Sequence, residues 1–277
     1  MIFCNGEFLA AEQPSILTSN RGFLFADGVF TTLKVSEGKI YFFNAHCERF
    51  SLHCKVMGFL PPKIESSAIC KLIELNNAHS GTWRLKIIAT AKAHSEGLAL
   101  GLREVGSFAM LLDPYLEEKK ESCSLKTYIQ PIVTPFSRIK SLACAARFNV
   151  LEDAKRHGCD DGLVLSPEGY LTETAFANFF WRQGNCLMTP SPALPLLWGI
   201  TLHFVEIAAR QLKLDWQEVI KTPAEIPADG QLFICNSLKG ILPVTSYDYT
   251  PFARDSAFES QLQVEYNQLA DLHVIAH

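Results

Sequence analysis

The chain has no hydrophobic run that could cross a membrane, since no stretch approaches 18 uncharged apolar residues. Its first residues, MIFCNGEFLAAEQ, also lack the basic segment and the long apolar core of a secretory signal peptide. We therefore expect a cytoplasmic protein with no membrane partner.

Paired metal-ligand motifs and a basic stripe are missing too. Nine cysteines, an odd count, form no Cys-x-x-Cys pair, which favours reduced thiols over disulfides or zinc, and we expect no metal site. The formal net charge of −4, from 25 Lys and Arg against 29 Asp and Glu, makes nucleic acid an improbable partner. No internal repeat or low-complexity tract is present.

What is present is an ordinary globular composition, with 277 residues, 48% hydrophobic and 19% charged. Alternating hairpins and helices predict an N-terminal α+β domain over residues 1–113. The polar, charged segment 114–124 predicts a linker, and residues 125–277 predict a C-terminal domain.

Local signals place the main elements. We predict hairpin turns at Asn5-Gly6 and Glu37-Gly38 and a helix over 142–157 that ends at Gly158. In the N-terminal part we also predict strands over 1–9, 28–44, 84–93 and 107–113 and helices near 46–59 and 66–77. In the C-terminal part we predict strands over 126–134, 162–174, 178–190 and 232–237, a helix starting at Thr201, and a tail helix over 256–273.

Glu173 is an acid within a strand-like apolar run, GYLTETAFANFFW. A carboxylate among apolar neighbours must meet a cation or a proton, and a pyridinium nitrogen is one such partner. Downstream, Gly199 permits close backbone approach, and the amides of Ile200 and Thr201 open a helix whose positive end suits a phosphate. One ligand with both a ring nitrogen and a phosphate is pyridoxal phosphate, which we predict as the cofactor.

Pyridoxal phosphate chemistry requires a lysine, and Lys140 in FSRIKSLACAARF is the candidate. Burial beside a cofactor would lower its pKa and make the amine nucleophilic. Taken alone, this residue would be interpreted as a surface lysine, and Glu173 as a solvent-facing strand residue, so the prediction depends on how such features combine.

Five motifs occur in one order along the chain. They are Asn20-Arg21-Gly22-Phe23 with 26–30 (ADGVF), Phe43-Asn44-Ala45-His46 with Arg49, Lys140, the segment 172–190 with Glu173, and Gly199-Ile200-Thr201. This arrangement resembles the fold type IV family of pyridoxal-phosphate aminotransferases and lyases. The resemblance implies a two-domain α+β fold like that of D-amino acid aminotransferases, an amino acid-like small-molecule substrate, and a homodimer.

The resemblance also implies roles for individual residues. Lys140 would bind the cofactor covalently and move the Cα proton, and Glu173 would pair with the ring nitrogen. The phosphate would be held by Arg49, Gly199, Ile200, Thr201, and Asn236 or Ser237. Phe30, Lys92 and His94 are substrate candidates, because relatives carry carboxylate-binding arginines near the last two positions. The chain departs from the family pattern in two places: Ala143 stands where the family often has asparagine, and the arginine-rich glycine loop of many relatives is absent.

Thr31 distinguishes the branches of the family. Aminotransferases tend to have glutamate after the aromatic residue, whereas 4-amino-4-deoxychorismate lyases tend to have threonine. The segments FICNSLKGILPV and ETAFANFFWRQGNCLMTP also resemble the lyases. We therefore expect lyase activity with Thr31 as a second catalytic residue, and no catalytic role for His46. The alternatives are a D-amino acid or branched-chain aminotransferase, and a non-catalytic binding protein on the same scaffold.

Overall fold

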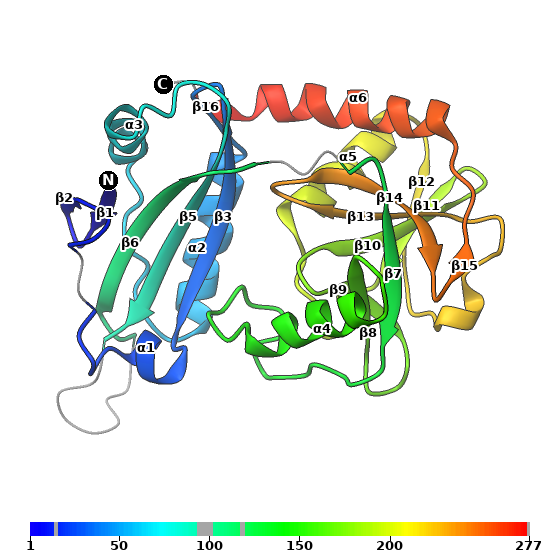
Figure 1. Cartoon of the computed structure of the whole chain (residues 1–277), viewed down its shortest axis with the longest axis horizontal. Helices are drawn as coiled ribbons and strands as arrows, with labels where there is room; N and C mark the ends of the chain where they lie inside the picture. The colour runs from blue at the N-terminus through cyan, green and yellow to red at the C-terminus, as the bar shows by residue number, and fades with distance from the viewer. Residues whose placement is uncertain (14–15, 93–101, 117–119, 276–277) are drawn as a thin grey trace. The chain divides into compact units, whose positions relative to one another are not determined.

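The computed structural model of the protein describes residues 1–13, 16–92, 102–116 and 120–275 (Figure 1). The chain forms two compact units. Unit 1 comprises Met1–Glu117, Ile139–Ala143 and His273–His277, and unit 2 comprises Glu118–Arg138 and Cys144–Leu272. This division differs from the predicted boundaries chiefly at residues 139–143, because the short segment with Lys140 joins the N-terminal unit.

Unit 1 contains a seven-stranded antiparallel sheet in the order β16-β4-β3-β5-β6-β1-β2. Both predicted turns are confirmed: Asn5 and Gly6, then Glu37 and Gly38, have positive φ, as a two-residue hairpin turn requires. The strands are β1 (Ile2–Cys4), β2 (Glu7–Leu9), β3 (Gly28–Ser36), β4 (Lys39–Tyr41), β5 (Thr82–Ala91), β6 (Val105–Pro114) and β16 (Val274–Ile275).

The side chains of β3 alternate between the two faces of the strand, and burial alternates with them. Val29, Thr31, Leu33 and Val35 are buried, and the residues between them are only partly so. Helix α2 (Phe43–Val56) contacts β3 and contributes Phe50 to the core of unit 1 (Figure 1). The unit also contains α3 (Ser66–Leu75) and α1 (Arg21–Phe25), a single turn capped by Asn20 that the sequence patterns did not predict.

Unit 2 contains a nine-stranded mixed sheet that closes on itself. Its order is β12-β11-β10-β13-β14-β7-β8-β9, and β9 pairs in turn with β10, while β15 pairs with β14. The bounds are β7 (Cys123–Tyr128), β8 (Asp161–Leu165), β9 (Leu171–Thr174), β10 (Asn178–Gln183), β11 (Cys186–Pro190), β12 (Asp215–Val219), β13 (Gln231–Asn236), β14 (Gly240–Tyr247) and β15 (Thr250–Pro251).

The helices of unit 2 are α4 (Ala145–Arg156), α5 (Ile200–Gln211), the short η1 (Pro223–Glu225) and α6 (Ser256–Leu272). Gly158 follows the end of α4 with φ +73°, which confirms the predicted helix stop. The predicted strand over 126–134 was wrong beyond Tyr128, and the helix predicted from 142 begins at Ala145. Among the described residues, no helix is long and apolar enough to span a membrane.

Candidate functional site

In unit 1, the segment that carries Lys140 is added to the edge of β3. The Phe30 N–H donates to the Lys140 carbonyl at 3.0 Å, and the Leu142 N–H donates to the Gly28 carbonyl at 3.0 Å. Gly28 is required here, because a Cβ would lie 2.5 Å from the Ala89 carbonyl oxygen. The backbone of Lys140 is therefore fixed by strand-like hydrogen bonds, although its segment has no strand pattern of its own.

His53, on α2, fixes the other side of this segment. Its Nδ1 accepts the backbone N–H of Lys140 at 3.1 Å. Burial, with smaller contributions from the charges of Arg49 and Lys140, lowers the pKa of His53 to about 4. Because Nδ1 is an acceptor, the neutral ring carries its proton on Nε2.

Two ammonium groups lie over the ring of Phe30. Lys140 Nζ is 4.8 Å from the ring centroid and Lys86 Nζ is 5.3 Å from it. Both distances are within the range of cation–π attraction. The structure thus brings Lys140 together with Phe30, two of the predicted site residues, and adds Lys86 from β5.

Thr31 and His46, both buried, and the partly buried Arg49 form a polar group on the side of β3 that α2 contacts. Thr31 Oγ1 lies 2.7 Å from His46 Nδ1 and accepts from Arg49 Nη2 at 3.4 Å. Burial lowers the pKa of Arg49 to about 10, and burial together with the charges of Arg49 and Lys140 lowers the pKa of His46 well below its ordinary value. The histidine is therefore neutral, and Thr31 can donate its proton to Nδ1.

The two predicted loop cations have different outcomes. Lys92 pairs with Glu104 at 2.6 Å, and both side chains are more than half exposed. An exposed pair of this kind contributes little energy and leaves Lys92 at the protein surface. His94 lies outside the described residues.

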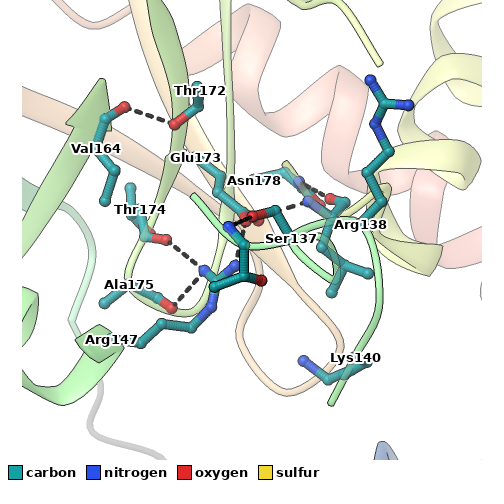
Figure 2. Close-up of polar contacts among 12 residues, drawn as sticks. Ser137, Arg138, Lys140, Arg147, Val164, Thr172, Glu173, Thr174, Ala175 and Asn178 are labelled. Atoms are coloured by element: carbon teal, nitrogen blue, oxygen red, sulfur yellow. Dashed lines mark hydrogen bonds and ion pairs between the residues drawn. The ribbon is translucent and has the colours of Figure 1, made fainter. Parts of the chain in front are cut away.

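In unit 2, Glu173 on β9 is buried and its Oε1 accepts two hydrogen bonds. One comes from Arg147 Nη2 at 2.5 Å (Figure 2), and the other from the Leu197 N–H at 3.1 Å. The acid therefore meets a cation supplied by α4, in addition to any cation that a ligand brings.

Asn178 connects this acid to the start of α5. It pairs with Glu173 across β9 and β10, and its Nδ2 donates to the Leu197 carbonyl at 2.7 Å. A Cβ on Gly199 would lie 2.1 Å from Asn178 Oδ1, so any larger residue here would displace the Asn178 side chain.

Ile200 and Thr201 form the first turn of α5, as predicted, and both are buried. Gly199 precedes them at the cap position and has no side chain to bond the first-turn N–H groups. Within the described part of the chain, Thr201 Oγ1 is buried without a well-formed hydrogen bond, although the Tyr266 phenol is near enough to interact with it. An open helix start with an unsatisfied hydroxyl suits an incoming anion.

Asn236 and Ser237 lie at the β13–β14 turn. Asn236 Oδ1 accepts the N–H groups of Leu238 and Lys239 at 3.1 and 2.9 Å, and Nδ2 donates to the Phe176 carbonyl at 3.4 Å. The side chain of Asn236 thus shapes the turn. Ser237 is the first turn residue after β13.

Three residues of this arrangement were missed at the level of sequence: Arg147, His53 and Lys86. Arg147 lies seven positions after Lys140, in a helix whose inward face has a weak apolar pattern. Because the predicted buried acid, Glu173, requires a cationic partner, a search for nearby cations could have identified Arg147. His53 and Lys86 depend on pairings between distant segments, and no local pattern reports these.

Comparison with known proteins places this geometry in a family. The family model described as "Amino-transferase class IV" matches residues 28–247. Aminodeoxychorismate lyase of Bacillus subtilis (strain 168) is 26% identical over 97% of this chain and 94% of the relative. D-alanine aminotransferase of Staphylococcus aureus (strain N315) is 31% identical over 99% of each chain.

A solved structure described as a hypothetical aminotransferase from Mycobacterium tuberculosis, in a pyridoxal-phosphate-bound form, superposes with a TM-score of 0.83. The two are 20% identical, and the match covers 98% of each chain. This similarity confirms the predicted two-domain α+β fold of fold type IV enzymes. The cofactor of the family is pyridoxal 5′-phosphate. The chain belongs to the class IV aminotransferase family of pyridoxal-phosphate enzymes.

Proposed function

We propose that this enzyme is a 4-amino-4-deoxychorismate lyase, which converts aminodeoxychorismate to 4-aminobenzoate and pyruvate for folate synthesis. The observation that carries the proposal is Thr31, a buried hydroxyl 2.7 Å from His46 Nδ1. It occupies the position where aminotransferases of the family tend to have a glutamate. The similarity to the Bacillus subtilis aminodeoxychorismate lyase over nearly the whole chain supports the same reaction.

The residues present fit the cofactor. In unit 1, Lys140 has a fixed backbone and supplies the amine, and Arg49 supplies a guanidinium whose charge burial disfavours until an anion is bound. In unit 2, Gly199, Ile200 and Thr201 offer first-turn amides and an unsatisfied hydroxyl to a phosphate, and Glu173 offers a carboxylate to a ring nitrogen. We assign Ser237 a supporting part in phosphate binding, and Asn236 a part in holding the turn.

When bound, the cofactor supplies an electron sink for the electrons released at Cα. Lys140 takes the Cα proton as general base, and its ammonium is then a general acid. Thr31 relays a proton: its hydroxyl gives its proton to the departing pyruvate oxygen and takes in its place the proton that Lys140 removed from Cα, while the contact with His46 Nδ1 holds the hydroxyl oxygen in position. A lyase differs from an aminotransferase in this second proton transfer, which is why the identity of residue 31 matters.

Lys86 is our choice for a substrate carboxylate, in place of the exposed Lys92. Its ammonium lies over the same ring as the ammonium of Lys140, whereas Lys92 pairs with Glu104 at the surface. Phe30, whose ring both ammonium groups approach, then packs against the substrate. The enzyme is proposed to be a cytoplasmic homodimer, as the family resemblance implies, and light scattering of the purified protein tests the oligomeric state.

A D-amino acid aminotransferase is the second candidate function. The 31% identity to D-alanine aminotransferase of Staphylococcus aureus over 99% of each chain favours it. Such an enzyme would begin with the same Cα deprotonation by Lys140, but it would return the proton to the cofactor and release no pyruvate from aminodeoxychorismate.

One experiment separates the two. The purified protein with bound cofactor is incubated with aminodeoxychorismate, and pyruvate is followed through coupled lactate dehydrogenase. In parallel, D-alanine and branched-chain amino acids are tested with 2-oxoglutarate. The lyase proposal expects stoichiometric pyruvate and 4-aminobenzoate. Transamination without pyruvate release from aminodeoxychorismate would replace it with the aminotransferase function.

A further inference from the structure

The ion pair between Arg147 and Glu173 joins α4 to β9 within unit 2. Arg147 Nη2 donates to Glu173 Oε1 at 2.5 Å, and Nη1 of the same guanidinium donates to the Ala175 carbonyl at 3.1 Å and the Thr174 carbonyl at 3.4 Å (Figure 2). The Glu173 side chain is 7% exposed and that of Arg147 is 21% exposed. Most of both charges is therefore removed from water.

The position of Arg147 in its helix is unfavourable in itself. It is the third residue of α4, where the positive end of the helix dipole disfavours a cation. Burial also acts to lower the pKa of Arg147, but the charge and hydrogen bond of Glu173, with smaller contributions from Cys144 and Asp161, outweigh burial and the pKa is raised. Glu173 is thus the main reason that a charged arginine is stable here.

The same pair fixes the carboxylate. Oε1 accepts from both Arg147 and the Leu197 N–H, so its orientation is set by two donors on different segments. Such an arrangement exists in the protein before any ligand binds. A carboxylate held in this way costs little reorganisation when a ring nitrogen approaches.

We propose that Arg147 is a positioning residue that holds the Glu173 carboxylate in its orientation for the cofactor, and that it shares the negative charge which Glu173 offers to the ring nitrogen. This inference rests on the proposed role of Glu173. A guanidinium on the carboxylate weakens the hold of Glu173 on the ring-nitrogen proton, so Arg147 tunes how strongly the ring withdraws electrons.

Other titratable groups act on the same guanidinium. Cys144, just before α4, and Asp161, on β8, both favour its charge. Asp161 Oδ1 accepts the Ala175 N–H at 3.2 Å, and burial raises the pKa of this carboxyl. These neighbouring charges also act on the ring nitrogen, so its titration is compared between variants and not interpreted from one curve.

The first experiment uses cofactor-free protein and measures the midpoint of thermal unfolding. Arg147→Met leaves a buried carboxylate without its cation and is expected to lower the midpoint by roughly 10 °C. The double variant Arg147→Met, Glu173→Gln removes both charges and is expected to recover at least half of that loss. A double variant no more stable than Arg147→Met would overturn the pairing.

The second experiment measures the ring nitrogen directly. The protein is loaded with pyridoxal phosphate carrying nitrogen-15 in its ring, and the chemical shift is followed against pH. In Arg147→Met, the full charge of Glu173 acts on the ring nitrogen, so its proton is held to a higher pH than in the wild type. Arg147→Lys, which keeps the charge without the planar fork, is expected to shift the midpoint less, in the same direction, and serves if Arg147→Met does not fold.

Arg156 provides a matched control. It lies on the same helix and pairs with Glu152 at 3.5 Å, but its side chain is 70% exposed. Arg156→Met is expected to change neither the unfolding midpoint by more than about 2 °C nor the nitrogen titration.

The outcomes distinguish a failure of the proposed role of Glu173 from a failure of the role of Arg147 alone. An unchanged titration in Glu173→Gln would show that this acid does not face the ring nitrogen, and the proposed role of Glu173 would fail together with the inference. A changed titration in Glu173→Gln with an unchanged one in both Arg147 variants would overturn the inference alone.

Discussion

Arg49 in unit 1 and Arg147 in unit 2 are both largely removed from water, yet their surroundings act on their charge in opposite directions. Burial lowers the pKa of Arg49 to about 10, whereas Glu173 raises the pKa of Arg147 despite burial. The contacts differ accordingly: Arg49 Nη2 donates to the neutral hydroxyl of Thr31, and Arg147 Nη2 donates to a carboxylate.

The difference shows two ways of preparing a site for a charged ligand. Unit 2 compensates its arginine within the fold, so the pair is ready and stable without a ligand. In unit 1 the net effect of the surroundings disfavours charge on Arg49, and an anion such as a phosphate would reverse that balance. The arrangement in unit 2 orients the Glu173 carboxylate, and the arrangement in unit 1 favours binding of an anion at Arg49.

The largest expected effect is that of Lys140→Ala, which removes the only amine that we assign to the cofactor. We expect turnover to be abolished and the visible absorbance of the lysine-bound cofactor to be lost. Lys86→Ala is the control, because it removes the other ammonium over the Phe30 ring and should keep that absorbance. Retained absorbance in Lys140→Ala, measured on the purified protein, would contradict the assignment.

Arg49→Met tests whether Arg49, unlike Arg147, acts on the phosphate of the cofactor. Loss of one charge-assisted contact to phosphate should weaken pyridoxal 5′-phosphate binding roughly 100-fold, while the affinity for pyridoxal, which has no phosphate, stays nearly unchanged. Arg147→Met should instead change both affinities by a similar factor, because Glu173 faces the ring and not the phosphate. Equilibrium titrations of cofactor-free protein measure the four values, and equal ratios in the two variants would remove the distinction.

Thr31→Val keeps the shape of the side chain and deletes its hydroxyl. If this hydroxyl transfers a proton to the departing group, lyase turnover should fall roughly 10- to 1,000-fold with cofactor binding intact. Thr32→Val is a matched control, since Thr32 is the next residue on β3 and projects from its other face. Turnover that falls equally in both variants, or in neither, would leave Thr31 as an ordinary strand residue.

The smallest effect concerns stability against pH. His53 has a pKa of about 4 in the folded protein against an ordinary value of 6.5, so the unfolded chain binds its proton first as the pH falls. The stability contributed by neutral His53 is complete above pH 6.5 and is lost toward pH 4, by at most about 3 kcal/mol. Denaturant unfolding across this range measures the loss.

His53→Asn tests the origin of that loss. The Asn Oδ1 can accept the Lys140 N–H but does not titrate, so the variant should lose less stability between pH 6.5 and 4 than the wild type. His46, whose pKa is also lowered, should leave a remaining slope. An unchanged pH dependence in His53→Asn would show that His53 is not the titrating group.

Local chemistry determined much of the fold. The turns at Asn5-Gly6 and Glu37-Gly38 need residues that tolerate positive φ, and the stop at Gly158 needs the same property, so these features could be predicted. The start of α5 after Gly199 was equally local. In contrast, the end of β7 and the start of α4 were mispredicted. The apolar residues continue after Tyr128, where β7 ends, and they begin before Ala145, where α4 starts, so the local pattern does not mark either boundary.

For the candidate site, the sequence by itself determined which residue types are available and in what order: a lysine, a buried acid, an arginine and a glycine-led helix start. Only the tertiary structure decided their partners. His53 reaches the Lys140 backbone across 87 positions of sequence, and Arg147 meets Glu173 across 26. The physical reason is that a buried polar group must be satisfied, but chain folding, not local propensity, determines which distant group satisfies it.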